Sequence, residues 1–524
     1  MVRHDLRRGG LISGAILSAV LGCAAVPALA DVSLYDQDGL KIDGAFLGGI
    51  TAFTSPGSQF GAGSWTNNGS GGPGRRISGK SSWTETFLAP ELKASYETES
   101  FGSFYGDVSA QVTATGGDGE PSLVSSTYGH PVLLQLENLY AGWKSGKTLD
   151  GLGLGLDENA LDLSAGRQSF RVADGFLISN GVNNQGKRGM FWTQSRTAFA
   201  QTGLAHVATG PVRGDVFYLE NVSSNSQMPV GVTDNARTKL IGGNIEFFEN
   251  AAAEEGKPAK DGASNYADRK WYVGLTYFNV IDAYSNGNLG FNPANTGNNS
   301  NVTNSLTSNR NGMNVVSVHV GGNPLPFLED FSIYGNYVNE SNGTANRKVD
   351  ANAWYLEPGY QLSSVAWTPK LSYRYAHFSG DKSPNDNTKK AYDPFFYNAI
   401  TRGFGTWFIG EIVGNYVISN SNVNINQLVL SVNPSDSLKV SALAYQYNYD
   451  AKAQNAGVTS SDLARELDFA VEWTINDNLS WANAFGIAHA GKGYRQNVTT
   501  NSAPAGLPMD KNWLLGESSL VVKF

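Results

Sequence analysis

The chain has 524 residues, a single cysteine, 16% charged residues and a formal net charge of −8. This negative balance lacks the basic footprint of a nucleic-acid-binding protein, so we expect no nucleic-acid partner. The 61 glycines, 23 tyrosines and 25 phenylalanines favour a β-rich chain with many turns.

Residues 1–30 have the organisation of a secretory signal peptide. Three arginines precede an apolar run over residues 11–25, and the small residues Ala28 and Ala30 fit a signal-peptidase site. We therefore predict cleavage after Ala30 and a mature chain of residues 31–524. An alternative is lipidation of Cys23, because residues 20–23 read VLGC and resemble a lipobox. A closed barrel needs no lipid anchor, so the first reading is favoured.

The mature chain has no apolar run near the roughly 18 residues that a spanning helix requires. If it crosses a membrane it must do so as a closed β-barrel, since a bilayer satisfies no open sheet edge. The first predicted strand, residues 39–53, places Leu40, Ile42 and Phe46 on one face and Lys41 and Asp43 on the other. A Gly/Ser/Asn-rich loop over residues 54–79 follows it.

The same alternation recurs along the chain and predicts about eighteen antiparallel strands, each with one polar face. After the first strand these are residues 91–98, 104–115, 139–144, 161–170, 197–208, 212–222, 239–248, 270–281, 315–321, 331–339, 353–362, 370–378, 427–432, 438–449, 467–475, 479–489 and 512–524. Polar faces without a second sheet to cover them favour a water-filled interior. The predicted fold is all-β, a transmembrane up-and-down β-barrel with long extracellular loops.

An even strand number places both chain ends at the periplasmic rim. Residues 403–419 could form a strand by composition, but counting them would make the number odd. We interpret them as part of a long loop, residues 379–426, that folds into the lumen and forms a constriction with Trp407, Phe408 and Ile409. The alternative is that they form a strand and another predicted strand is false.

Turns and loops fit the same topology. Residues 433–436 and 476–478 are typical of tight hairpin turns. The Asn/Gly/Ser/Thr-rich residues 285–312 suit an extracellular loop, whereas the charged residues 251–269 fall on the periplasmic side and are expected to be mobile.

The last strand resembles the signal that closes Gram-negative outer-membrane barrels and is read by the barrel assembly machinery. Its closure residues Leu520, Val522 and Phe524 share one face with Leu514, and Glu517, Ser519 and Lys523 occupy the other. An amphipathic edge strand of a soluble protein is the alternative.

We find no pattern for catalysis, a metal or a cofactor, and expect a protein that is not an enzyme. The six histidines have no metal-ligand spacing, and the mature chain has no G-x-S-x-G nucleophile elbow. Residues 36–39 and 381–387 could hold Ca²⁺, but turns have the same composition.

Three stretches resemble the alginate export family of outer-membrane proteins. They are LSAGRQ at residues 163–168, YDPFFY at 392–397 followed by GTWFIGE at 405–411, and RELDFAVEW at 465–473 followed by NLS at 478–480. The resemblance implies a monomeric barrel of about eighteen strands, narrowed by inward-folded loops and lined by arginines and lysines for a polyanionic sugar chain.

Carried onto this sequence, the resemblance assigns Arg167 to the strand motif and Trp407 to Glu411 to the inner loop. Arg196, Lys370 and Arg374 are further pore-lining candidates by position. Lys370 and Arg374 share the predicted lumen parity, but Arg167 shares the lipid-facing parity, where an arginine at mid-bilayer costs roughly 2–4 kcal/mol. A bulge at Gly166 that resets the register, or a rim position, would resolve this; we favour the bulge.

These observations predict a passive outer-membrane channel for a polar or anionic carbohydrate or similar solute, surrounded by outer-membrane lipid. The strand faces predicted to line the lumen also carry acidic residues. The sequence is therefore as compatible with a mixed-charge field across the pore as with a basic one. A general diffusion or nutrient-uptake porin for small carboxylates or sugars is the alternative, and a barrel enzyme or adhesin is a third. The solute and the direction of transport do not follow from the sequence.

Overall fold

The computed structural model describes most of the chain after residue 31. The described residues are 32–61, 65–67, 75–77, 79–121, 130, 132–149, 153, 156–179, 181, 198–224, 235–250, 269–284, 310–344, 348–395, 409–418, 420–501 and 509–524. The predicted signal peptide and most of the predicted loops at 251–269 and 285–312 lie outside these residues.

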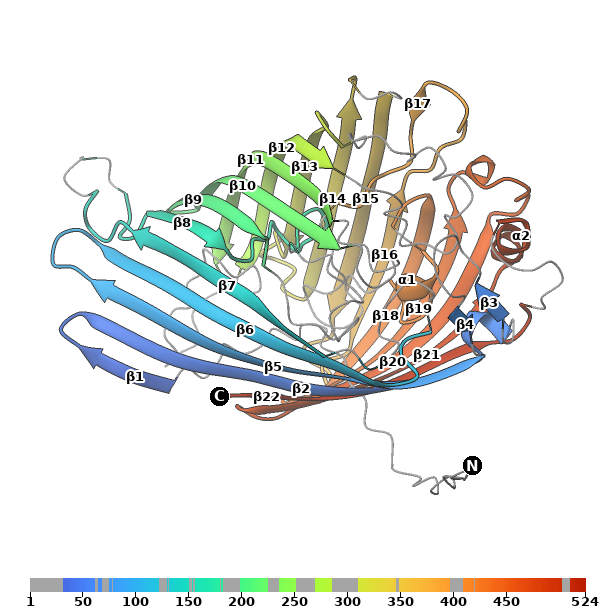
Figure 1. Cartoon of the computed structure of the whole chain (residues 1–524), viewed down its shortest axis with the longest axis horizontal. Helices are drawn as coiled ribbons and strands as arrows, with labels where there is room; N and C mark the ends of the chain where they lie inside the picture. Colours follow the sequence, from blue (N-terminus) through green and yellow to red (C-terminus); the bar gives the residue numbers. More distant parts are fainter. Residues whose placement is uncertain are drawn as a thin grey trace, which may run out of the picture.

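Eighteen long strands form one antiparallel wall (Figure 1). They are β2 (Leu40–Pro56), β5 (Lys80–Glu97), β6 (Ser103–Gly117), β7 (Val132–Lys144), β8 (Leu161–Arg167), β9 (Gln201–Thr209), β10 (Val212–Ser224), β11 (Asn235–Asn250), β12 (Arg269–Tyr284), β13 (Asn314–Gly322), β14 (Phe331–Asn342), β15 (Lys348–Gln361), β16 (Lys370–Phe378), β18 (Val423–Ser435), β19 (Leu438–Tyr449), β20 (Asp462–Asn476), β21 (Leu479–Ala490) and β22 (Trp513–Lys523). Each of the eighteen predicted strands overlaps one of them, so the predicted barrel is confirmed.

The wall closes between its first and last strands. The ladder of β2 and β22 runs antiparallel from Leu47↔Lys523 to Thr54↔Gly516. Phe524 extends it, because Phe46 N–H donates to the Phe524 carbonyl at 2.7 Å and Phe524 N–H donates to the Phe46 carbonyl at 2.9 Å. This closure removes the open edges that a bilayer would leave unsatisfied.

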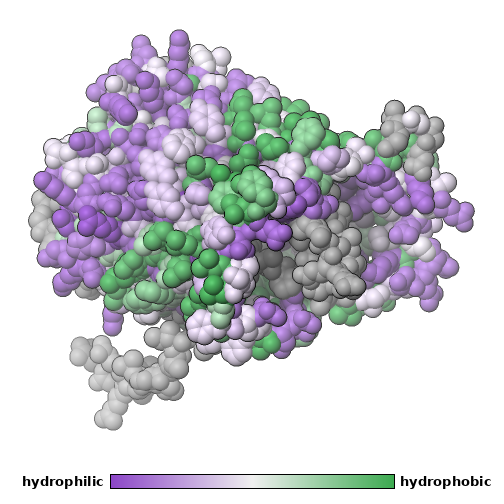
Figure 2. All heavy atoms as spheres, turned by 180° about the vertical axis from the view of Figure 1, so that it is seen from behind, coloured by the Kyte–Doolittle hydropathy of each residue, from purple (hydrophilic) through white to green (hydrophobic). Residues whose placement is uncertain are grey.

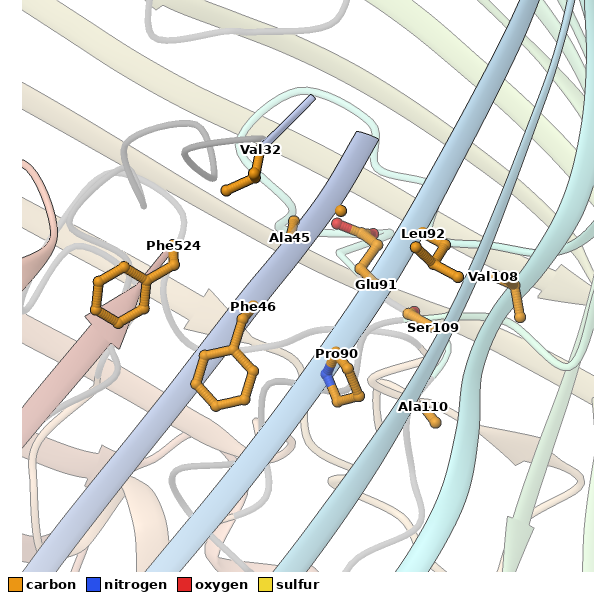
Figure 3. Close-up of a pocket in the computed structure, with 11 residues that line it drawn as sticks. Val32, Ala45, Phe46, Pro90, Glu91, Leu92, Val108, Ser109, Ala110 and Phe524 are labelled. Carbon is orange, nitrogen blue, oxygen red and sulfur yellow. The ribbon is translucent and has the colours of Figure 1, made fainter. Parts of the chain in front are cut away.

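A short strand that the sequence did not predict covers the rest of the β2 edge. β1 (Val32–Gln37) pairs antiparallel with residues 40–44 of β2, and Val32 lies opposite Gly44. Val32 and Phe524 therefore occupy the same edge of β2, separated by the position opposite Ala45. Phe46 and Phe524 project side by side here and line an apolar hollow of about 560 Å³ on the outer face (Figure 3).

The largest difference between a predicted and an observed strand boundary is at the start of β5. β5 begins at Lys80, eleven residues before the predicted start at residue 91, and its early inward side chains include the buried Trp83 and Phe87. Trp83 stacks on Phe53 of β2 with ring centroids 4.5 Å apart. Aromatic residues facing inward disturb the polar and apolar alternation by which strands are recognised in sequence.

The remaining elements are short. They are η1 (Ser58–Gly61), β3 (Trp65–Asn67), β4 (Arg75–Ile77), β17 (Thr388–Lys389), α1 (Val413–Tyr416), η6 (Lys452–Gln454) and α2 (Lys492–Asn501). Among the described residues, no helix has the length and apolar character that crossing a bilayer would require.

Candidate functional site

The wall presents an apolar outer face. On the outward parity of β20, Leu467 is 50% exposed and Phe469 53%, and comparable apolar side chains recur on the other strands. Figure 2 shows such side chains gathered in patches on the outer surface. Aromatic pairs, Phe101 with Trp143 and Trp473 with Trp481, lie near the end of the barrel that carries the short turns. An apolar band flanked by aromatic residues is typical of a barrel in a bilayer.

The closure residues predicted from the last strand follow this parity. Leu520 and Val522 alternate with the buried Ser519 and Val521, and Phe524 is 51% exposed. Glu517 and Lys523 lie on the opposite, buried parity. The predicted faces of the terminal strand are therefore correct.

The inward parity carries polar and charged side chains that pair with one another. Arg374 Nη1 of β16 lies 3.7 Å from Glu357 Oε2 of β15, and Arg213 Nε of β10 donates to Asp215 at 2.9 Å. At the end of the barrel that carries the short turns, Lys439 Nζ lies 3.0 Å from Glu472 Oε2. The wall of the lumen therefore has a mixed charge distribution.

One fully buried group combines a cation, an anion and an imidazole. Arg269 Nη1 donates to Glu246 Oε2 at 2.6 Å, and His319 Nε2 lies 3.0 Å from Glu246 Oε1. The Arg269 and Glu246 side chains are 0% exposed, and the guanidinium lies 4.4 Å from the centroid of the Phe248 ring. The sequence analysis missed this group because its three members lie on three different strands.

Residues 168–179, here called the crossing segment, leave the wall after β8 and cross the lumen. Phe176 is 1% exposed and packs against Tyr355 of β15 and Phe378 of β16, with ring centroids 5.2 and 5.7 Å away. Tyr355 Oη also donates a hydrogen bond to Asp174. Residues 168–170 were predicted as part of a strand, but they bend inward because Phe170 finds its apolar contacts inside the barrel.

Residues 409–418, here called the inner segment, pack against β19 and β20 and contain α1 (Figure 1). Glu466 of β20 accepts hydrogen bonds from Ile412 N–H at 2.6 Å and Val413 N–H at 2.7 Å. Asp468 of β20 accepts one from Glu411 N–H at 3.1 Å. Because Glu466 and Asp468 face inward, the inner segment lies in the lumen.

A glycine permits this close approach. Gly410 has φ +101°, and a Cβ atom there would lie 2.1 Å from Tyr447 Oη and 2.6 Å from Glu466 Oε2. Tyr447 Oη donates to the Ile409 carbonyl at 2.6 Å. The prediction that residues 403–419 form an inward loop rather than a strand holds for the described part, residues 409–418. The lumen there is packed by this loop and is not uniformly water-filled.

The predicted pore-lining residues fall in different places. Arg374 is 1% exposed on the inner face of β16, Lys370 is on the same parity at the start of that strand, and Glu411 is buried in the inner segment. Arg196 and Trp407 lie outside the described residues.

The position of Arg167 differs from the one predicted with a bulge at Gly166. The ladders of β8 show no register shift at Gly166, so the expected bulge there is wrong; the shift lies in β7, between Leu136 and Leu139. Arg167 is instead the last residue of β8, where its Nε donates to the Leu136 carbonyl at 3.1 Å.

In the described part of the chain, no metal centre accompanies this site. Within the described ranges, no group of three or more His, Cys, Asp or Glu side chains is arranged to hold a metal ion. The charged inner wall and the two segments that narrow the passage make the lumen the functional candidate.

Comparisons with known proteins found one family and several solved structures to which the chain is similar. The profile of a family described as alginate export matches residues 313–506. Among solved structures, the chain is similar to Pseudomonas aeruginosa OccK5 (OpdH), with 9% identity, 92% of this chain and 97% of that chain covered, and a TM-score of 0.48. It is also similar to Pseudomonas aeruginosa OccK3 (OpdO), with 11% identity, 92% and 95% covered and a TM-score of 0.46.

A more remote similarity is to Salmonella typhi OmpF in complex with daunomycin, with 10% identity, 94% and 100% covered and a TM-score of 0.38. No curated protein matches the sequence. The match of residues 313–506 to the alginate export family, together with the closed barrel and its apolar outer face, supports a passive outer-membrane channel.

Proposed function

We propose that this channel conducts a polar or anionic carbohydrate, or a similar solute, down its gradient across the outer membrane. The observation that carries the proposal is the arrangement inside the barrel, where charged side chains line the wall and two segments narrow the passage. A narrowed, charged passage selects solutes by size and by charge. The alginate export match adds a polyanionic sugar as the solute class to test first.

Lysines with partial exposure are the groups most able to meet a solute. Lys439 lies on the inward parity of β19 with 34% of its side chain exposed. Lys93 lies on the inward parity of β5 with 36% exposed. Both lie beside carboxylates, Glu472 at 3.0 Å and Glu91 at 3.2 Å.

This pairing favours a second candidate, a general diffusion or nutrient-uptake porin for small carboxylates or sugars. A field in which cations are matched by carboxylates orients polar solutes without requiring an anion.

Planar-bilayer conductance in the presence of a uronate polymer separates the two. We expect the polymer to block the wild-type channel, and Lys439→Gln to weaken the block. Lys270→Gln is the matched control, because Lys270 lies at the register shift at the start of β12, beside Glu249 at 2.9 Å, with 40% of its side chain exposed. Indifference of the wild type to the polymer would favour the porin alternative, and absence of any conductance would refute both.

We also propose that the protein is a monomer. Its signal peptide is cleaved after Ala30, and the barrel assembly machinery then inserts it into the outer membrane. The family match favours a protein that is not an enzyme. Sequencing the N-terminus of the protein purified from outer membranes tests the cleavage site, and a chain that begins upstream of residue 31 would refute it.

A further inference from the structure

Four acidic side chains meet where the inner segment touches the wall. Glu411 of the inner segment, Glu466 and Asp468 of β20 and Glu517 of β22, here called the carboxyl cluster, have exposed fractions of 1%, 2%, 0% and 7%. Both oxygens of Glu411, Oδ1 of Asp468 and Oε1 of Glu517 accept no hydrogen bond. The cluster therefore concentrates buried carboxyl oxygens with too few donors.

The surrounding elements add little positive charge. Glu85 of β5 contributes another carboxyl near Glu517, and Tyr445 and Tyr447 of β19 contribute phenols. Arg374, on the same wall, pairs with Glu357 on β15.

Across the residues that the structure describes, no group of three or more His, Cys, Asp or Glu side chains is arranged to hold a metal ion, and Glu411 and Asp468 pack closely against β21. Gly486 of β21 faces both, and even a Cβ atom on it would lie 2.9 Å from Asp468 Oδ1 and 3.2 Å from Glu411 Cβ. Protonation of one carboxyl group would supply a hydrogen-bond donor to its neighbours without requiring additional space.

Physical chemistry requires such a donor. Several carboxylates that are buried, adjacent and unpaired cannot all remain ionised, because desolvation and mutual repulsion both oppose the charge. Burial, and then the negative charges of Glu517 and Asp468, raise the pKa of Glu411 well above its ordinary value. A protonated Glu411 can donate a hydrogen bond to an oxygen that otherwise has no donor.

We propose that the carboxyl cluster is a proton-controlled latch that holds the inner segment on the wall at low pH and releases it as the pH rises. The direction follows from linkage. Glu411 binds its proton more tightly when the segment is docked than when it is released into water, so docking is fully favoured below the ordinary glutamate pKa of about 4.3 and is lost as the pH rises through the raised value. For one coupled proton, the ratio of docked to released segment falls about tenfold per pH unit in that range.

The direct test is the reactivity of a buried thiol. Val417 is 1% exposed in the docked segment, so Val417→Cys places a thiol that a maleimide reaches only after release. Cys23, the only natural cysteine, lies upstream of the predicted cleavage site. The thiol itself ionises with pH, and this alone changes its rate of reaction with maleimide. The rate of Val417→Cys is therefore divided by the rate of the double variant Val417→Cys with Glu411→Gln. In the double variant residue 411 stays neutral and can donate a hydrogen bond at every pH.

We expect this ratio of rates to rise as the pH increases above the ordinary glutamate pKa of about 4.3, by up to about tenfold per pH unit. A ratio that stays near one, or that rises toward acid, would overturn the latch. Glu517→Gln, made on the wall side of the same contact, should also lower the pH sensitivity and replaces Glu411→Gln if that variant does not assemble. Glu249→Gln is the control, since Glu249 lies at the rim with its side chain 50% exposed beside Lys270.

Conductance gives a second readout that depends on the proposed function. Mean conductance should rise with pH in the wild type and in Glu249→Gln, and should change little in Glu411→Gln. If the protein does not conduct, the thiol assay still measures release, so failure of the channel proposal and failure of the latch are distinguishable.

Discussion

Replacing Leu428 with arginine tests whether the outer face of the barrel contacts hydrocarbon. Leu428 projects outward from β18 and is 47% exposed. It lies five residues from Val423, the first residue of the strand. At about 3.3 Å per residue and a tilt of about 40°, this places it about 13 Å below that end, near the middle of an apolar band of roughly 25 Å.

Leu362 provides a matched control. It is 45% exposed, but it lies in the turn after Gln361, the last residue of β15. The same substitution at both positions removes leucine side chains of similar exposure, so the energy of lost packing largely cancels between the two variants. The remaining difference in stability reports the depth of each position in the membrane. An arginine should cost about 2–4 kcal/mol at the midplane and about 0–1 kcal/mol at the interface. The difference of about 2–3 kcal/mol corresponds to roughly 30- to 150-fold in the unfolding equilibrium constant.

The measurement is reversible unfolding by guanidinium chloride of the barrel inserted in phosphatidylcholine vesicles, followed by tryptophan fluorescence. Extrapolation to zero denaturant gives the free energy of unfolding of each variant. Equal losses for Leu428→Arg and Leu362→Arg would mean that Leu428 does not face hydrocarbon, and the membrane orientation derived from strand parity would be refuted.

Three further outcomes are expected. Glu246→Ala removes the 2.6 Å partner of a fully buried Arg269 and should lower the free energy of unfolding by about 3–5 kcal/mol, measured in the same assay; a loss below about 1 kcal/mol would contradict the ion pair's structural role. Gly410→Ala would place a carbon 2.1 Å from Tyr447 Oη and force a strained positive φ, so the inner segment should be released and conductance should increase at neutral pH, whereas unchanged conductance would argue against its constricting role. Deleting residues 32–37 uncovers the β2 edge and should increase aggregation of the refolded barrel in a sedimentation assay, with an unchanged monomer fraction as the contrary result.

The alternation of side chains made the wall predictable. In β16 the outward Leu371 and Tyr373 and the inward Ser372 and Arg374 can be assigned from the sequence, because lipid and lumen impose opposite chemistry on neighbouring residues. Where the inner face is apolar, as at Trp83 and Phe87, that contrast disappears and the beginning of β5 was missed.

The interior was less predictable because its contacts join distant residues. The inward loop followed from counting strands, but the contacts of Glu411 with Glu466, Asp468 and Glu517 depend on the depth to which the loop descends. The crossing segment has no period that predicts its path, and its position is set by Phe176 meeting Tyr355 and Phe378 on the far wall. The bulge was predicted in β8 but occurs in β7, because local sequence does not reveal which of two neighbouring strands takes the extra residue.

The positions of Val32 and Phe524 on one edge of β2 suggest that the chain would tolerate circular permutation. Since one strand position separates them, a short peptide could join the two ends into a single uninterrupted strand, and new ends could be opened at a hairpin such as residues 477–478. A circularly permuted chain of this kind would keep every rung of the wall, but Phe524 would become internal and the new carboxyl terminus, Asp477, would follow β20. Whether such a chain still reaches the outer membrane would separate what the finished barrel needs from what its insertion needs.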